Sequence, residues 1–459
     1  MQVDLIIRGG TIVTSSARFI ASIGIRGEQI VAIGGDLESE RVIDARGLHV
    51  LPGGIDAHVH LTPDEEPADG IAWADDFTSG SEAAFAGGIT TLGNMTFARQ
   101  DEPLLDALDR EAALVERDAM ADVILHPVLY TPSQEIIDEI ADLPGYGHTD
   151  IKFFMSTPRF DAEASGFLAA TRAAGKQEML TMIHCEDWPL LHEATQRLID
   201  SGHGSLRYYA DARPIISEVV ATQRAVAIAE ATGAPVYIVH LSSRRALEVC
   251  REARSRGVPV YVETRPFYLH LTRERFDEPD GAKYVGQPPL REQDDVDALW
   301  DGLAQGAIDT VCTDHAPWAL EHKLDPTLNV ARLRPGAENL QTMLPMLYSE
   351  GVRTGRISLE RMVAVTATNA ARLFGLYPRK GTIAPGSDAD LVLWDLEAER
   401  EVRNEDMRSR AGHSVYNGWP VIGWPVTTIR RGEVVFDRGT LHASPGSGRL
   451  LSRSLMEHL

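Results

Sequence analysis

The sequence predicts an α/β fold: a (β/α)8 TIM barrel joined to a small β-sandwich domain that is built from both termini. Two observations support this prediction. Strand-like and helical patterns alternate through the middle of the 459-residue chain, whereas both ends contain short strand patterns and glycine turns. A chain of this length usually forms more than one domain. We therefore expect residues 1–52 and 380–459 to form one discontinuous β domain, and residues 53–379 to form the barrel.

Both ends of the chain have the pattern of short β-strands. The Gly9-Gly10 and Gly34-Gly35 pairs separate apolar stretches near the N-terminus. The expected N-terminal strands are residues 4–8, 11–14, 21–26, 29–34, 41–44 and 49–51. The expected C-terminal strands are residues 390–394, 426–430 and 434–436. Two all-β ends around a long α/β middle predict that the ends join each other.

The middle of the chain contains eight strand candidates. They lie around residues 54–58, 89–95, 122–130, 149–155, 179–185, 235–241, 258–264 and 308–314. Helical patterns separate them, for example over residues 102–119, 217–231, 244–256 and 296–303, and two long helices are expected over residues 340–349 and 358–374. A doubly wound open sheet is the competing fold, but no Gly-x-Gly-x-x-Gly follows the early strands. The pattern therefore favours the barrel.

Composition excludes several classes of function. Hydrophobic residues make up 44% of the chain and charged residues 24%, as in ordinary soluble globular proteins. The formal net charge of -23 argues against nucleic-acid and anionic-membrane surfaces. The three cysteines form no paired framework, and the N-terminus has no signal-peptide pattern. We therefore expect a cytoplasmic protein with neither nucleic acid nor a membrane as its partner.

Residues suited to binding metal ions follow five of the strand candidates. They are His58 and His60, then Lys152, His184, His240 and Asp314. Parallel strands of a barrel end at one rim, so these side chains can meet there. His58 and His60 point to the same side of a strand and together can bind one divalent ion. Taken singly, His184 and His240 also fit core histidines that are hydrogen-bonded to the backbone. Asp56 fits either an outer partner of the histidines or a turn residue.

Lys152 lies in an apolar strand pattern, between Ile151 and Phe153. Burial of an ammonium is costly and lowers the pKa of the amine. An uncharged amine can react with carbon dioxide to form a carbamate, which is a carboxylate able to bridge two ions. The alternative is a lysine that extends to the rim and pairs with an acid. Because four histidines and one carboxylate need a bridge to hold two ions, we favour the carbamate.

The order of these motifs resembles the cyclic amidohydrolases, which include dihydropyrimidinases, hydantoinases, allantoinases and dihydroorotases. The resemblance covers essentially the whole chain. It depends on Asp56-Ala57-His58-Val59-His60 after Pro52-Gly53-Gly54, on Lys152, His184 and His240, on Thr313-Asp314-His315-Ala316-Pro317, and on Gly386 to Leu391.

The resemblance implies a binuclear metal site. His58, His60 and Asp314 would bind the first ion together with carbamylated Lys152. Lys152 would also hold the second ion, together with His184 and His240. A hydroxide that bridges the ions would attack the ring amide, and Asp314 would act as general base and then as general acid. Zinc is the expected ion, while manganese, cobalt and iron stay open.

Substrate-binding positions follow from the same resemblance. Dihydroorotases bind a substrate carboxylate through an arginine, an asparagine and a histidine, and this chain has Thr62, Phe97 and Trp318 at those positions. A pocket without fixed cations disfavours a buried carboxylate. Phe97 and Trp318 are expected either to line an apolar pocket for a ring substituent or to pack against the loop near Trp73.

Dihydropyrimidinases and hydantoinases place a tyrosine five residues after the carbamylated lysine, to stabilise the developing oxyanion. This chain has Thr157 there, which leaves allantoinase-like substrates open. Gly286, Gln287 and Asn339 match the positions that hold the ureide edge, although Gln287 and Asn339 also fit ordinary turn residues.

The sequence therefore predicts a metal-dependent hydrolase that opens a hydantoin-type or dihydropyrimidine-type ring. Allantoinase-like and dihydroorotase-like activities are the alternatives. So are a non-catalytic homologue and a single-metal deaminase of the wider amidohydrolase group, which has no lysine on strand four. The resemblance also implies a homo-oligomer, either a tetramer or a dimer.

Overall fold

The computed structural model describes the whole chain except residues 64–66, 68–69 and 100–101. Eight parallel strands within this part of the chain form the barrel sheet, in the order β13-β12-β11-β10-β9-β8-β7-β6. They are β6 (Gly54–Val59), β7 (Ile89–Phe97), β8 (Asp122–Val128), β9 (Asp150–Phe154), β10 (Leu180–His184), β11 (Val236–Ile238), β12 (Val260–Thr264) and β13 (Thr310–Val311). A parallel bridge between Val59 and His315 brings β6 beside the segment that follows β13. The predicted (β/α)8 barrel is confirmed.

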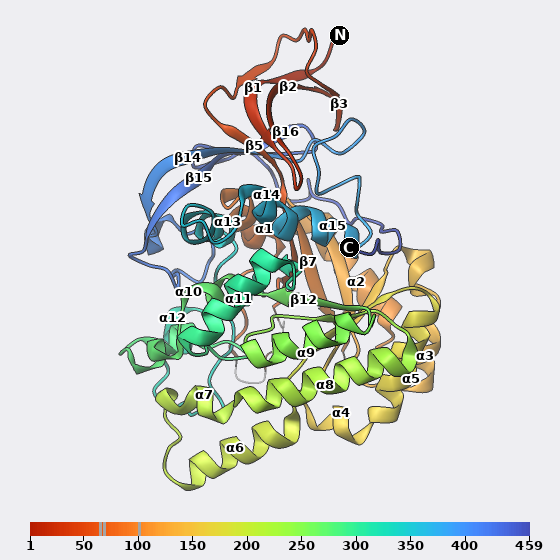
Figure 1. The fold of residues 1–459 in the computed structure, drawn as a ribbon, viewed down its shortest axis with the longest axis vertical. Helices are drawn as coiled ribbons and strands as arrows, with labels where there is room; N and C mark the ends of the chain where they lie inside the picture. Colours follow the sequence, from red (N-terminus) through yellow and green to blue (C-terminus); the bar gives the residue numbers. More distant parts are fainter. Residues whose placement is uncertain (64–66, 68–69, 100–101) are drawn as a thin grey trace.

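Amphipathic helices cover the outside of the barrel (Figure 1). The longer ones are α1 (Phe77–Ala86), α2 (Leu104–Asp118), α5 (Ala164–Lys176), α6 (Trp188–Asp200), α8 (Ile215–Thr232), α9 (Arg244–Ser255) and α11 (Gln293–Gln305). The shorter ones are α3 (Gln134–Glu139), α4 (Pro158–Ala162), α7 (Tyr209–Ala212), α10 (Pro266–His270) and α12 (Leu320–Lys323). No helix in the described part of the chain is long and apolar enough to cross a membrane.

The two long helices expected after the eighth strand are interrupted. The first consists of α13 (Met343–Leu347) and a π-helical turn over Tyr348–Val352. The second consists of α14 (Leu359–Val363), a π-helical turn over Ala364–Thr368, and α15 (Asn369–Leu373). A π-helical turn accommodates one extra residue per turn, and the spacing of apolar residues gives no sign of it.

The two ends of the chain join in one mixed sheet, which confirms the prediction that both contribute to the same β domain. Its strands are β1 (Leu5–Val13), β2 (Arg18–Arg26), β3 (Gln29–Ile33), β4 (Val42–Asp44), β5 (His49–Pro52), β14 (Leu391–Glu401), β15 (Pro420–Arg430), β16 (Glu433–Asp437) and β17 (Thr440–Leu441). The ends meet where β5 pairs with β14, antiparallel, with Pro52 opposite Leu391. The two strands expected over residues 4–14 are one strand, because a bulge between Ile7 and Gly10 lets β1 continue.

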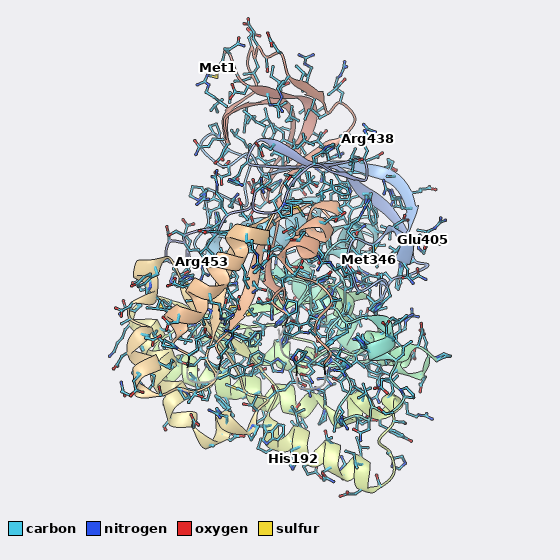
Figure 2. All side chains as sticks on the ribbon, turned by 180° about the vertical axis from the view of Figure 1, so that it is seen from behind. Met1, His192, Met346, Glu405, Arg438 and Arg453 are labelled. Atoms are coloured by element: carbon cyan, nitrogen blue, oxygen red, sulfur yellow. The ribbon has the colours of Figure 1, made fainter. Side chains whose placement is uncertain are left out.

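The chain returns to the barrel after β17. Leu450 forms a parallel bridge with Val123, and Arg453 pairs with the buried Asp150 at the start of β9. Figure 2 shows Arg453 beside the barrel, far from Met1 and Arg438 in the β domain. The exact domain boundaries stay a prediction.

Candidate metal centre

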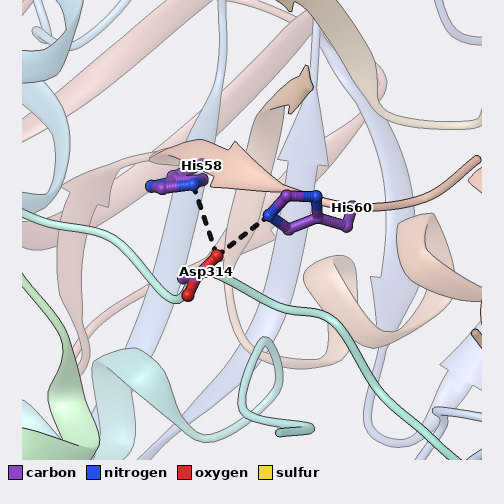
Figure 3. A group of neighbouring side chains, drawn as sticks. All are labelled: His58, His60 and Asp314. Carbon is purple, nitrogen blue, oxygen red and sulfur yellow. Dashed lines mark hydrogen bonds and ion pairs between the residues drawn. The ribbon is translucent and has the colours of Figure 1, made fainter. Parts of the chain in front are cut away.

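His58, His60 and Asp314 meet at the rim where the barrel strands end. One potential ligand atom from each lies within 4.8 Å of the others. Asp314 Oδ1 lies 3.0 Å from His60 Nε2 and 3.3 Å from His58 Nε2 (Figure 3). All three side chains are buried. Two imidazoles and a carboxylate in this arrangement suit a divalent ion such as zinc.

His184 and His240 extend this group to the next strands. His184 Nδ1 lies 2.9 Å from His240 Nε2, and the rings of His58 and His240 stack with centroids 5.5 Å apart. The four predicted histidines therefore form one continuous row around the rim. His60 Nδ1 and His240 Nδ1 have no hydrogen-bond partner among the described residues.

Lys152 is completely buried in β9. Its Nζ has no hydrogen-bond partner in the described part of the chain and lies 5.1 Å from the centre of the Phe154 ring. Burial lowers the pKa of Lys152 to about 8, against the opposing charges of Glu263 and Asp314. The alternative, a lysine that extends to the rim and pairs with an acid, is therefore wrong, because Nζ has no such partner among the described residues.

Two buried carboxylates hold the histidines from behind. Glu263 Oε1 lies 2.9 Å from His58 Nδ1 and accepts the backbone N–H of His240 at 2.8 Å. Glu186 Oε2 lies 2.8 Å from His184 Nε2 and also pairs with Arg213. These contacts leave His58 Nε2 and His184 Nδ1 facing the centre, and such outer partners orient metal-binding histidines.

The sequence prediction missed both carboxylates, although each left a signal. Glu263 is a charged residue within an apolar strand pattern, as Lys152 is, and Glu186 follows His184 by two residues. Asp56 holds the backbone of a neighbouring segment. Asp56 is fully buried and accepts the backbone N–H of Thr313 at 3.0 Å, so it anchors the segment that leads to Asp314.

The backbone is strained at two of the predicted ligands. His240 has φ +38° and Asp314 has φ +49°, a left-handed region in which residues other than glycine are uncommon. Strain of this kind concentrates at functional sites, where the surrounding structure enforces it.

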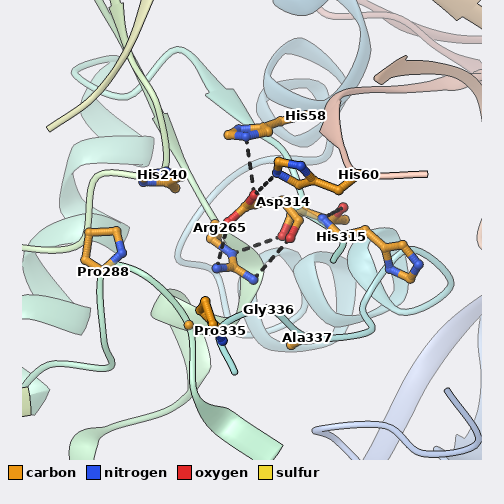
Figure 4. Close-up of polar contacts among 12 residues, drawn as sticks. His58, His60, His240, Arg265, Pro288, Asp314, His315, Pro335, Gly336 and Ala337 are labelled. Carbon is orange, nitrogen blue, oxygen red and sulfur yellow. Dashed lines mark hydrogen bonds and ion pairs between the residues drawn. The ribbon is translucent and has the colours of Figure 1, made fainter. Parts of the chain in front are cut away.

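A buried cation lies beside Asp314 and is paired with it, so the expectation of a pocket without fixed cations stays a prediction. Arg265, which the sequence prediction overlooked, is completely buried, and its Nη1 lies 3.0 Å from Asp314 Oδ2 (Figure 4). Burial by itself would raise the pKa of Asp314. Arg265 and His58 outweigh that effect and hold the pKa of the carboxyl well below its usual value.

Phe97 and Trp318 both pack against Trp73, which agrees with the expectation that they pack near this residue. The Trp73 ring centre lies 6.2 Å from that of Phe97 and 6.1 Å from that of Trp318. Phe97 also stacks on His60, with ring centres 5.7 Å apart. The aromatic group therefore borders the metal-ligand residues on the side of β6 and β7.

The other predicted substrate-binding residues lie in different surroundings. Thr62 donates to Glu111 at 3.2 Å and accepts from Asn94 at 2.7 Å, while Thr157 is the half-buried residue before α4. The Gly286 carbonyl accepts the Tyr209 hydroxyl at 3.2 Å, and the next residue, Gln287, is half-buried.

Asn339 has one buried acceptor without a partner in the part of the chain that the structure describes. Its backbone N–H donates to His315 Nδ1 at 3.3 Å, whereas its buried Oδ1 has no partner among the described residues. The substrate-binding roles of all seven residues stay predictions.

Comparisons with known proteins agree with a metal-binding hydrolase fold. The amidohydrolase family matches residues 49–435. The chain is 38% identical to a D-hydantoinase from Ralstonia pickettii over 457 residues, which cover 98% of this chain and 99% of the relative. A crystal structure of dihydropyrimidinase from Brevibacillus agri superposes with a TM-score of 0.94 at 34% identity, covering 98% of this chain and 99% of that one. An L-hydantoinase (dihydropyrimidinase) from Arthrobacter aurescens gives a TM-score of 0.91 at 30% identity, covering 98% and 100%.

Proposed function

The chain belongs to the amidohydrolase family, and we propose that it is a cyclic amidohydrolase that opens hydantoin-type or dihydropyrimidine-type rings at a binuclear metal site. Full-length relatives named D-hydantoinase and dihydropyrimidinase support the reaction class. The observation that supports it best is the row of four buried histidines around Asp314, with the unpartnered Lys152 beside them.

The residues present fit two divalent ions. His58, His60 and Asp314 would hold one ion, and His184 and His240 the other, with zinc first and manganese, cobalt or iron as alternatives. Bound ions would supply an activated water and polarise the ring carbonyl. Glu263 and Glu186 keep the ligand nitrogens turned toward the centre.

Lys152 would provide the bridge as a carbamate. The neutral amine attacks the carbon of CO2, an N–C bond forms as one C–O π bond opens, and the nitrogen loses a proton to solvent. The product is an anionic carboxylate at the end of the lysine stem. Complete burial, the absence of a hydrogen-bond partner among the described residues, and a pKa of about 8 all favour this reaction.

Asp314 would move the proton during ring opening. Its Oδ1 faces the imidazoles of His58 and His60, where it can take a proton from the attacking water. The same carboxyl then returns the proton to the ring nitrogen as the C–N bond breaks. The products are a carboxylate and a released ureide or amide nitrogen on one open chain.

The aromatic residues Trp73, Phe97 and Trp318 would hold an apolar substituent of the ring. Trp73 and Phe97 contact His60 and Trp318 packs on Trp73, so a substituent held by this group would lie next to the reacting amide. Gly286, Gln287 and Asn339 would bind the ureide edge, with the free Asn339 Oδ1 as an acceptor for a ring N–H. We also infer a homo-oligomer, a tetramer or a dimer, in the cytoplasm.

A substrate panel tests the proposal. Hydantoins with varied 5-substituents, dihydrouracil, allantoin and dihydroorotate are assayed with added zinc or manganese and bicarbonate. We expect ring opening of hydantoins or dihydrouracil, loss of that activity in Asp314→Asn, and about two equivalents of metal per chain, as a binuclear site requires. A preference for dihydroorotate, or activity that survives Asp314→Asn, would contradict it.

A further inference from the structure

We propose that Arg265 is a positioning residue for Asp314: its guanidinium holds both the carboxylate and the left-handed backbone that directs this carboxylate toward the histidines. The inference rests on the proposed function, in which Asp314 transfers the proton. It adds a residue that neither the motifs nor the family match assigns.

The position of Arg265 follows from the barrel. It comes directly after β12, as Asp314 comes shortly after β13, so both lie at the rim where the strands end. Its guanidinium lies over the Phe267 ring, with Cζ 4.3 Å from the ring centre, and also contacts Asp314. A completely buried guanidinium needs a paired anion, and Asp314 is the carboxylate that the structure pairs with it.

Arg265 contacts one short segment at three points. Its Nε donates to the Thr313 carbonyl at 3.0 Å, its Nη2 to the Asp314 carbonyl at 3.5 Å, and its Nη1 lies 3.0 Å from Asp314 Oδ2. Nη1 has no aligned hydrogen-bond acceptor among the described residues, so its contact with Oδ2 is one of charge rather than a directed hydrogen bond. Backbone and side chain of Asp314 are thus held by one planar group.

These contacts stabilise a conformation that the chain would otherwise avoid. Asp314 has φ +49°, and the turn is fixed on its other side by Asp56, which accepts the N–H of Thr313. Within the carboxylate, Oδ1 faces His58 and His60 while Oδ2 faces Arg265 (Figure 4). Without Arg265, the Oδ2 end of this carboxylate loses its charged partner and the Thr313 and Asp314 carbonyls lose their donors.

The space for Arg265 also depends on a glycine. A Cβ added at Gly286 would lie 3.0 Å from Arg265 Nη1 and 2.7 Å from Phe267 Cζ. The segment that is predicted to bind the ureide edge therefore packs directly against the guanidinium. A displaced Arg265 would disturb Asp314 and this segment together.

Arg453 provides a matched control at the other end of the barrel. It is buried too, pairs with Asp150 and donates to the Leu125 carbonyl at 2.8 Å. It makes the same kinds of contact, to a carboxylate and to a backbone carbonyl, but touches none of the predicted metal ligands. Loss of Arg453 should therefore cost stability without changing proton transfer.

The test compares Arg265→Met, Arg265→Lys and Arg453→Met in the metal-loaded enzyme. For each we measure kcat and KM on the preferred ring, metal retained after dialysis, and the thermal midpoint of the metal-free protein. Arg265→Met should lower kcat by up to about 100-fold, a loss that misplacing a reacting group by about 1 Å can cause, with a smaller change in KM. It should also lower metal retention. Arg265→Lys should restore part of the kcat and part of the metal retention. Arg453→Met should lower the thermal midpoint and leave kcat unchanged.

The outcomes separate this inference from the proposed function. A wild-type protein that opens no ring contradicts the proposed function. An active wild type whose kcat and metal retention survive Arg265→Met contradicts the role of Arg265 alone, as does an equal loss of kcat in Arg453→Met. Should Arg265→Met fail to fold, wild-type kcat in Arg265→Gln would overturn the inference, and a lowered kcat there with a wild-type thermal midpoint would support it.

Discussion

Two lysines are buried at opposite ends of the barrel, and their surroundings differ completely. Lys152 is on β9 beside the histidines at the rim, whereas Lys380 lies against Asp122, the first residue of β8. Their exposed fractions are 0% and 1%. Lys380 Nζ has three carboxylate partners, Asp122 at 2.6 Å, Asp390 at 2.7 Å and Asp388 at 3.1 Å. Lys152 Nζ has no hydrogen-bond partner in the described part of the chain.

The comparison teaches that burial alone does not decide what a lysine does. Burial by itself lowers the pKa of both amines, but the three carboxylates outweigh it at Lys380 and raise the pKa of that residue. At Lys152 burial prevails, and the pKa falls to about 8. Lys380 is a structural cation between the barrel and the β domain, whereas Lys152 is a buried amine whose lowered pKa suits the proposed carbamate.

Replacement of Lys152 should have the largest effect on activity. Lys152→Met removes the amine that would bridge the ions. Both kcat and metal affinity should therefore fall by far more than about 100-fold, the largest loss expected when only an outer partner of a ligand is removed. The metal-free variant should be at least as stable as the metal-free wild type, because a poorly partnered amine has left the core. Metal analysis and thermal unfolding measure the two effects. An active, metal-loaded Lys152→Met enzyme would contradict the carbamate.

Lys380→Met should show the opposite pattern. Three carboxylates would remain buried around an apolar side chain, and breaking a buried ion pair typically costs about 3–5 kcal/mol of unfolding free energy. The kcat of the folded fraction should be unchanged, because Lys380 contacts none of the metal-ligand residues. Urea unfolding measures the free energy of unfolding, and titration of active sites gives the folded fraction from which kcat is calculated. A loss of kcat larger than the loss of folded protein would mean that the two ends of the barrel are coupled.

The same contrast exists between two pairs of histidine and carboxylate. His58 Nδ1 lies 2.9 Å from Glu263 Oε1 at the rim, and His126 Nδ1 lies 2.9 Å from Asp150 at the opposite end. Glu263→Gln should weaken metal affinity about 10–100-fold, since it releases an outer contact of a ligand. Asp150→Asn should destabilise the fold and leave metal affinity as it is. Competition with a chelator measures the metal affinity. Equal losses of metal affinity in Glu263→Gln and Asp150→Asn would show that the two carboxylates do not differ in role.

Local patterns were enough to predict the eight strands and the rim residues. A strand end depends on the alternation of nearby side chains, so Lys152 and the four histidines could be placed from their own neighbourhoods. The partners Arg265 and Glu263 could not, because nothing local shows which residue across the rim an arginine or a glutamate will meet. The sequence also contains no sign of the π-helical turns at Tyr348–Val352 and Ala364–Thr368.

The pH dependence of carbamate formation gives the finest test of the comparison. Only the neutral amine attacks CO2, so in metal-free enzyme the rate of carbamate formation at Lys152 should increase as pH rises toward its pKa of about 8 and then level off. Near pH 7 about one Lys152 in ten is neutral, against about one in 3,000 for a lysine of ordinary pKa. Lys380, whose pKa is raised, should stay charged and unreactive over the same range.

Carbon-13 NMR with labelled CO2, held at a constant dissolved concentration from about pH 6 to about pH 9, measures the initial rate at which the carbamate signal appears. The carbamate signal should be absent in Lys152→Met and retained in Lys380→Met. An initial rate that does not change with pH, or a signal that survives Lys152→Met, would show that Lys152 is no more reactive than Lys380.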